Sequence, residues 1–300
     1  MTTQILIELI AVLTAVRDDT PQVMTIDHGR SLPSGPLENA HRSLQAGVRA
    51  WVERQTGHPI GHVEQLYTFA DHGRMLTTEQ VRTIAISYLA LTRSHAGETG
   101  WRDWYDYFPW ENAKSETGRT CRAHIERRLC QWVAGMDNPA TRIAQWQRCV
   151  SLFAIGDMAV WDDELVLQRY ELLYEAGLVP ESGCAAADAV PGQPMHHDHR
   201  RILATGMARL RAKIRYRPVV FELMPEEFTL LHLQRVMESL SGIHIHKQNF
   251  RRLITQQQLV EETGAMEENT GGRPARLFRF CGEVRQARQF TGTKIPLAVP

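Results

Sequence analysis

The strongest constraint on the fold is a helix–turn–helix pattern followed by a hairpin pattern near the C-terminal end. Residues 225–242 are predicted to form a helix, with proline and glutamate at its N-terminal end and glycine at its C-terminal end. Residues 246–257 are predicted to form a second helix. Residues 259–264 and 275–280 read as two strands on either side of a loop. Helix, short turn, helix and hairpin is the order of a winged helix-turn-helix, so the sequence predicts a DNA-binding unit here.

The second of these helices has one apolar side and one polar side. Phe250, Leu253 and Ile254 follow helical spacing and form the expected buried side. Lysine and arginine suit phosphate contacts, while arginine, asparagine and glutamine suit base edges. The candidate DNA-binding residues of the helix are therefore the polar ones, namely His246, Lys247, Gln248, Asn249, Arg251 and Arg252.

The hairpin supplies two more candidate DNA contacts, Arg273 and Arg276. Residues 242–300 carry nine Lys/Arg and five Asp/Glu, a local charge of +4 in a chain whose net charge is zero. Strand alternation places Arg276 opposite Arg273 and Arg279, so the three arginines do not share one ligand. Phe278 and Phe280 lie on one face and are the expected core pair. The plainer alternative is a solvated basic helix and hairpin.

The rest of the chain predicts a layered structure before this unit. Strands are expected at 5–16, 22–26, 62–69 and 82–91 around a helix within 37–57, followed by helices at 120–135, 138–156 and 161–179. The run 182–194 reads as a linker between a first domain, 1–181, and a second, 195–300. The second domain is expected to begin with a basic helix at 198–218 and a short strand at 219–224.

Cysteine usage and hydropathy favour a cytoplasmic protein. The five cysteines are scattered and odd in number, without a CxxC pair, which indicates free thiols. The apolar run 5–16 contains Glu8 and is too short to cross a bilayer, so no membrane association is expected. The histidines in MHHDHR, 195–200, lack the usual helical metal-ligand spacing, and no metal site is predicted.

Several motifs together resemble a known family of regulators. The C-terminal set resembles the winged-helix half of the Nudix-related regulators of NAD metabolism, the NrtR group, and is closest to their alphaproteobacterial NadQ-type relatives. The motifs are EFTLLHLQRVMESLSG, HKQNFRRLI, LVEETG and GGRPARLFRF, with LYTF and ISYLAL matching the Nudix-like half and WYDYFPWE and RYELLYEAGLV the NadQ branch. The resemblance implies a repressor of NAD biosynthesis genes whose N-terminal domain senses an adenine nucleotide.

The expected fold is therefore mixed α/β (α+β). It combines an N-terminal degenerate Nudix-like α/β/α domain with a helical extension and a C-terminal winged helix-turn-helix. Nudix hydrolases hold divalent cations with the glutamates of GX5EX7REUXEEXGU. With Gly57 aligned to the last glycine, the glutamate positions hold Arg42, Trp51, Arg54 and Gln55. Without clustered carboxylates, no catalytic residues and no hydrolysis are predicted.

Ligand binding does not require those acids, because arginines bind phosphates directly and aromatic rings stack on bases. The candidate effector residues are Arg42, Arg49, Arg54, Arg74, Trp101 and Trp104. For each arginine the alternative is a solvated charge, and for each tryptophan it is core packing.

The predicted protein is a homodimer that binds a palindromic operator in double-stranded DNA. Its effector is NAD, ATP or ADP-ribose. Two other functions stay open. One is an active Nudix pyrophosphohydrolase acting on NAD or ADP-ribose, with a C-terminal interaction module. The other is a nucleotide-binding adaptor that does not bind DNA. Hydrolysis and salt-dependent DNA binding distinguish the three.

Overall fold

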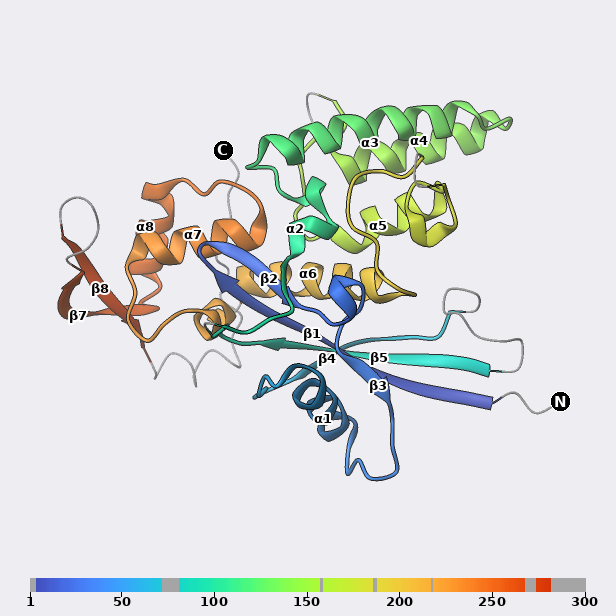
Figure 1. Cartoon of the computed structure of the whole chain (residues 1–300). Coiled ribbons are helices and arrows are strands. Elements are labelled where there is room, and N and C mark those ends of the chain that lie inside the picture. Colours follow the sequence, from blue (N-terminus) through green and yellow to red (C-terminus); the bar gives the residue numbers. More distant parts are fainter. Residues whose placement is uncertain are drawn as a thin grey trace.

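A mixed sheet lies at the centre of the molecule, with helices on both faces and a smaller unit at one end (Figure 1). The computed structural model describes residues 4–71, 81–95, 97–156, 159–185, 188–216, 218–267 and 274–281. The strand order is β4-β5-β1-β2-β6, with β3 paired to β1, and β1 and β5 are parallel. The strands are β1 (Gln4–Arg17), β2 (Thr20–Met24), β3 (Ser34–Pro36), β4 (Glu64–Phe69), β5 (Val81–Leu91) and β6 (Trp101–Asp103).

Alternation along β1 divides the core into two layers. Ile10 and Val12 belong to the larger cluster on one face, whereas Leu9, Ala11 and Leu13 belong to the cluster on the other. The neighbouring β5 also contributes residues to both clusters, which confirms the prediction of a strand buried on both faces. The central strands therefore require helices above and below them.

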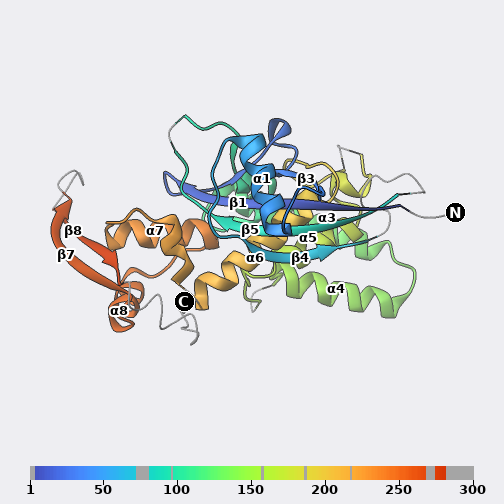
Figure 2. The same ribbon diagram turned by 90° about the horizontal axis from the view of Figure 1, so that it is seen from below.

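Helix α1 (Leu44–Thr56) covers one face, and Figure 2 shows it lying across the sheet. Ser43 caps its first turn, and Gly57 ends it in the left-handed conformation with φ 66°, as predicted for this glycine. Val48 and Val52 are buried against the sheet. The helix starts at Leu44, later than the start of the predicted range at residue 37, because residues 37–43 form a loop.

The opposite face carries α2 (Trp104–Tyr107) and α6 (His199–Tyr216), and α5 (Val166–Glu175) packs on α6. The helices α3 (Glu116–Ala134) and α4 (Pro139–Phe153) lie above them (Figure 1). The three predicted helices in this region are confirmed, although α5 begins five residues later than expected. Its acidic residues precede the helix, where the Asp162 side chain accepts a hydrogen bond from Glu164 N–H at 2.9 Å.

The C-terminal unit is a winged helix. Its elements are α7 (Leu230–Ser241), α8 (Lys247–Gln256), β7 (Val260–Glu267) and β8 (Ala275–Phe280). Phe228 and Phe278 exchange two backbone hydrogen bonds of 2.9 and 2.8 Å, so residue 228 extends the hairpin sheet instead of the helix predicted from residue 225. The strand predicted at 219–224 is wrong, because Pro218–Leu223 forms a 3₁₀ turn.

Helix α6 packs with the sheet. Its buried residues Leu203, Met207 and Leu210 belong to the same cluster as Ile10 and Val12. The preceding segment, read as a linker, also packs on the body: Val190 N–H donates to Leu178 O at 2.8 Å. The expected division placed α6 in a second domain of residues 195–300. In the structure, the apolar face of α6 instead packs on the sheet and completes its second covering layer.

Two further findings concern the chain's chemistry. All five cysteines lie in the described residues and none forms a disulfide. Within the described ranges, no helix is both long and apolar enough to span a membrane.

Candidate nucleic-acid interface and nucleotide site

Helix α8 presents a continuous polar surface. Phe250 and Ile254 are 2% and 0% exposed, which confirms the predicted buried side. The helix contains no acidic residue. All six polar candidates of this segment are exposed, namely His246, Lys247, Gln248, Asn249, Arg251 and Arg252.

The turn before α8 is held by side chains of α7. The Glu238 carboxylate accepts from Ile245 N–H at 2.9 Å, and Gln234 donates to Ile245 O at 2.9 Å. Partial burial raises the pKa of Glu238, but hydrogen bonds from Ile245 and Gln234 outweigh it and hold the pKa below its usual value. The carboxylate therefore stays charged and fixes the angle between the two helices.

The hairpin arginines are paired with acids of the neighbouring strand. Arg276 donates to Glu262 at 2.8 Å and Arg279 to Glu261 at 2.6 Å, and all four side chains are exposed. DNA phosphates would compete with these pairs, which are weak at a solvated surface. The other hairpin candidate, Arg273, lies outside the described residues.

Phe278 and Phe280 pack against the main core, as predicted for this pair. The hairpin is therefore fixed by its apolar face, and its arginines remain on the outside.

The candidate effector arginines lie along α1 but do not converge. Arg49 donates to Gly61 O at 3.0 Å, whereas Arg54 stacks over the Trp51 ring at 4.0 Å. Five residues apart, these two positions differ by about 140° around the helix. Arg42 is exposed just before α1, and Arg74 lies outside the described residues.

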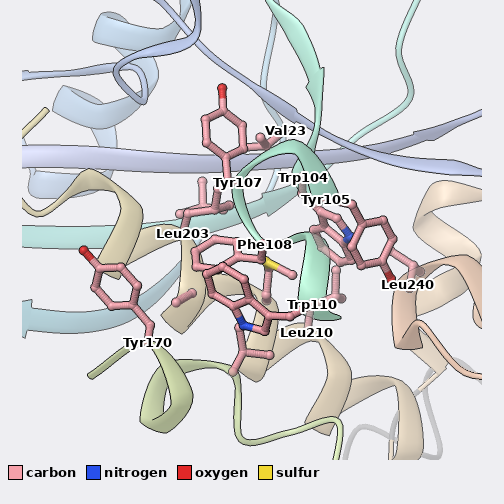
Figure 3. Close-up of a cluster of buried hydrophobic side chains, with 14 of the residues drawn as sticks. Val23, Trp104, Tyr105, Tyr107, Phe108, Trp110, Tyr170, Leu203, Leu210 and Leu240 are labelled. Carbon is pink, nitrogen blue, oxygen red and sulfur yellow. The ribbon is translucent and has the colours of Figure 1, made fainter. Parts of the chain in front are cut away.

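The two candidate tryptophans have different environments. Trp104 is 0% exposed and packs between the sheet and α6 (Figure 3), so its proposed stacking on a nucleotide is wrong. Trp101 keeps exposed surface and donates through Nε1 to Glu98 at 2.9 Å. Only Trp101 of the pair is positioned to meet a ligand.

Sequence reasoning missed a buried network next to Trp101. His58 is 1% exposed and bridges Glu98, at 2.7 Å, and Thr92, at 2.7 Å. Burial raises the pKa of Glu98, but hydrogen bonds from His95, Trp101 and His58 lower it to about 2. The one sequence feature that could have indicated this network is His58, which directly follows the helix-ending Gly57. The network ties the loop after β5 to the end of α1.

The positions aligned with the Nudix glutamates hold β3 against α1. Trp51 Nε1 donates to Pro36 O at 2.9 Å, and Gln55 exchanges hydrogen bonds of 3.0 and 2.8 Å with the Ser34 backbone. Among the described residues, no cluster of three His, Cys, Asp or Glu side chains is arranged to hold a metal ion. These side chains pack and bond to the backbone instead of lining an acidic site.

A groove of about 420 Å³ lies elsewhere, where the sheet meets the winged helix. The β1–β2 turn contributes Asp18 and Asp19, the loop after β5 contributes Arg93, and the segment around α7 contributes Glu226 and His232. None of the candidate effector residues that the structure describes lines it.

Comparison with known proteins connects the C-terminal unit to one family. Residues 220–280 match the family described as the NrtR DNA-binding winged helix domain. The chain is 41% identical over 84 residues to the ADPR responsive transcriptional repressor NtrR of Acinetobacter baylyi, a match that covers 28% of this chain and 33% of that repressor. The match thus spans a third of the relative's length, and it confirms the resemblance stated for the C-terminal unit.

Solved structures show the fold of the whole chain. Shewanella oneidensis NrtR, crystallised with a 27mer DNA, superposes with a TM-score of 0.53 at 20% identity, covering 96% of this chain and 99% of that one. A MutT/nudix family protein from Enterococcus faecalis gives a TM-score of 0.52 at 15% identity, covering 94% and 88%. The architecture is a Nudix-like α/β domain with a C-terminal winged helix, as predicted.

Proposed function

We propose that this chain is a DNA-binding transcriptional repressor of NAD biosynthesis genes whose Nudix-like domain binds ADP-ribose. The observation that carries the proposal is the exposed polar side of α8 within residues that match a DNA-binding winged helix. A relative that shares 41% identity over 84 residues is an ADPR-responsive repressor, which favours ADP-ribose over NAD and ATP as the effector.

In this proposal α8 enters the major groove of a palindromic operator. Arg251 and Arg252, both exposed, contact bases or phosphates, with the other polar residues of 246–249 beside them. A homodimer supplies the second winged helix, and the hairpin arginines, including Arg273 and Arg276, contact the flanking backbone. The protein acts in the cytoplasm, consistent with its free cysteines.

We assign an effector phosphate to one exposed guanidinium group at α1, because the arginines of this helix do not converge on a single site, and we assign the adenine to Trp101. Arg42 and Arg54 are exposed near the N-terminal and C-terminal ends of this helix, with Arg49 between them. Guanidinium–phosphate bonds do not need a metal ion. ADP-ribose changes operator affinity only if it binds the DNA-competent and incompetent arrangements with different affinities.

The test is a mobility-shift titration on the promoter of an NAD-synthesis operon. Arg251→Ala and Arg252→Ala should each weaken binding by about tenfold, and loss of a phosphate contact should lower the salt slope by about one. Arg142→Ala removes the same charge from exposed α4, away from α8, and should leave the affinity unchanged. Equal affinity of all three variants for the promoter would refute the DNA-binding role.

The same titration is repeated with ADP-ribose, NAD and ATP, and ADP-ribose should shift the binding curve most. Incubation with ADP-ribose and Mg²⁺ should leave the nucleotide intact, because the positions of the metal-binding glutamates hold other residues. Turnover above background would instead favour the pyrophosphohydrolase alternative, without bearing on the DNA-binding result.

A further inference from the structure

The C-terminal end of α7 rests on the segment that follows β6. Tyr105 donates its hydroxyl hydrogen bond to Ser239 O at 2.6 Å, and Lys114 pairs with Glu238 at 3.4 Å. Gly242, the first residue of the turn, lies so close that a Cβ there would overlap the carbonyl oxygen of Glu111. The turn that leads into α8 is thus in direct contact with the Nudix-like part of the chain. This part, the sheet with helices α1 to α6, is the sensor domain of the proposed function.

Beneath this contact lies a buried charge cluster of Glu111, Arg169 and Arg211, each 0% exposed. Arg169 donates to both Glu111 oxygens, at 2.6 and 2.8 Å, and Arg211 donates to one of them at 2.7 Å. Burial raises the pKa of Glu111, but Arg169 and Arg211 outweigh it and hold the pKa below its usual value. The carboxylate is therefore charged and fixed on both sides.

Arg211 extends the buried charge cluster to the winged helix. Its Nε donates to Leu240 O at 2.9 Å, and its Nη1 donates to Asp163 O at 3.0 Å. Leu240 belongs to the last turn of α7, where free carbonyl groups favour a cation. One guanidinium thus joins α6, the loop before α5 and the end of α7.

These contacts tie the C-terminal end of α7 to the segment after β6 and to α6. The segment once expected to separate the two domains lies before α6, and α6 packs on the sheet. Buried residues of the sheet, α6 and α7 belong to one hydrophobic cluster. The winged helix is mounted on the sensor domain by buried contacts.

We propose that Tyr105 and the buried charge cluster are positioning residues for operator recognition: they fix the orientation of α7 and α8 on the sensor domain, and so set the half-site spacing that a dimer accepts. This inference rests on the proposed function.

Tyr105 and Tyr107 form a matched pair for the test. Both lie on α2, both are buried, and both donate from the hydroxyl at 2.6 Å, Tyr105 to Ser239 O and Tyr107 to Gly29 O. Figure 3 shows Tyr105 beside Leu240 of α7, whereas Tyr107 points away from that helix. Tyr105→Phe removes a bond to the winged helix, and Tyr107→Phe removes an equivalent bond within the sensor domain.

The experiment first locates the operator by footprinting the wild-type chain on the NAD-synthesis promoter. Affinity is then measured for that operator, for an operator lengthened by one base pair between half-sites, and for a single half-site. Tyr105→Phe should reduce the preference for native spacing by about fivefold, the effect expected for one net hydrogen bond. Its affinity for the single half-site should match the wild type, and Tyr107→Phe should keep the wild-type preference.

A second pair of variants separates positioning from backbone strain. Gly242→Ala forces the turn away from Glu111, whereas Gly177→Ala has a similar φ, 68° against 73°, with no atom within 4 Å of the added Cβ. Gly242→Ala should relax the spacing preference further than Tyr105→Phe, and Gly177→Ala should leave it unchanged.

Two results would overturn the inference: an unchanged spacing preference in both Tyr105→Phe and Gly242→Ala, or an equal loss of affinity for the single half-site and the operator. Absence of any wild-type footprint would overturn the proposed function as well.

Discussion

Burial changes the acid–base chemistry of His199, in the first turn of α6. The side chain is 3% exposed, and its Nδ1 accepts a hydrogen bond from Leu32 N–H at 2.9 Å. Burial, with smaller contributions from His197 and His196, lowers the pKa of His199 to about 3. The folded protein therefore holds this imidazole neutral, since a proton on Nδ1 would break the bond to the Leu32 backbone.

Because the pKa of His199 is lowered in the folded protein, we expect the free energy of unfolding to decrease in mild acid. Its folded pKa lies below the unfolded value near 6.5, so the unfolded chain binds the extra proton as the pH falls between them. The free energy of unfolding should fall by about 2 kcal/mol from pH 6.5 to pH 5 on this account. In urea denaturation, the free energy of unfolding of His199→Gln should depend less steeply on pH between pH 6.5 and pH 5 than that of the wild type.

A substitution of the exposed His246 by Gln controls for loss of an imidazole. Parallel pH profiles for the wild type and His199→Gln would contradict the assignment.

At the scale of elements, packing and backbone hydrogen bonds hold α1 against β3. The ring of Trp51 lies directly over Gly35. Its indole N–H donates to Pro36 O, and Gln55 bonds to the backbone of Ser34. The helix keeps its place on the sheet through packing and backbone bonds, which need no carboxylate.

Gly35 should therefore tolerate no side chain. A Cβ there would overlap the Trp51 ring, so Gly35→Ala is expected to lower the free energy of unfolding by about 1–3 kcal/mol through overpacking. Gly61→Ala is the matched control, because no atom lies within 4 Å of its added Cβ, and it should change stability by less than about 0.5 kcal/mol. Chemical denaturation measures the free energy of unfolding of both variants. Equal values for Gly35→Ala and Gly61→Ala would rule out the contact between Gly35 and the Trp51 ring.

For the whole molecule, the decisive feature is the double role of α6. Its apolar residues cover the sheet, while Arg211 near its C-terminal end bonds to α7. A chain cut within the predicted linker would lose the covering layer and expose Ile10 and Val12, which are now 0% exposed. The Nudix-like domain therefore needs residues beyond the linker in order to fold.

Two truncated chains test this dependence. A chain of residues 1–194 should lack a cooperative unfolding transition, because one face of the sheet is left open. A chain of residues 1–216 retains α6 and should unfold cooperatively in a thermal circular dichroism experiment. Cooperative unfolding of the 1–194 chain would show that α6 is dispensable to the sheet.

Local patterns alone were enough to predict most of the helices and strands and the polar face of α8. Helical spacing of Phe250 and Ile254 identified the buried side of α8, because residues three and four apart share a face whatever surrounds the helix. Glycines at positions 57 and 242 ended two helices as expected, since the left-handed conformation is a property of the residue itself. The motifs also identified the winged helix.

Burial and pairing between distant residues were decided only by the tertiary structure. Trp101 and Trp104 lie in the same short aromatic run, and the sequence does not indicate which of them is buried. In the structure, Trp101 keeps exposed surface and Trp104 lies in the core. Arg211 reads as one more cation on a basic helix, but the fold buries it against Glu111, 100 residues away. Such partners depend on which surfaces meet after the chain has folded. The sequence alone therefore determined most of the elements and the polar face of α8, and packing decided which side chains keep exposed surface.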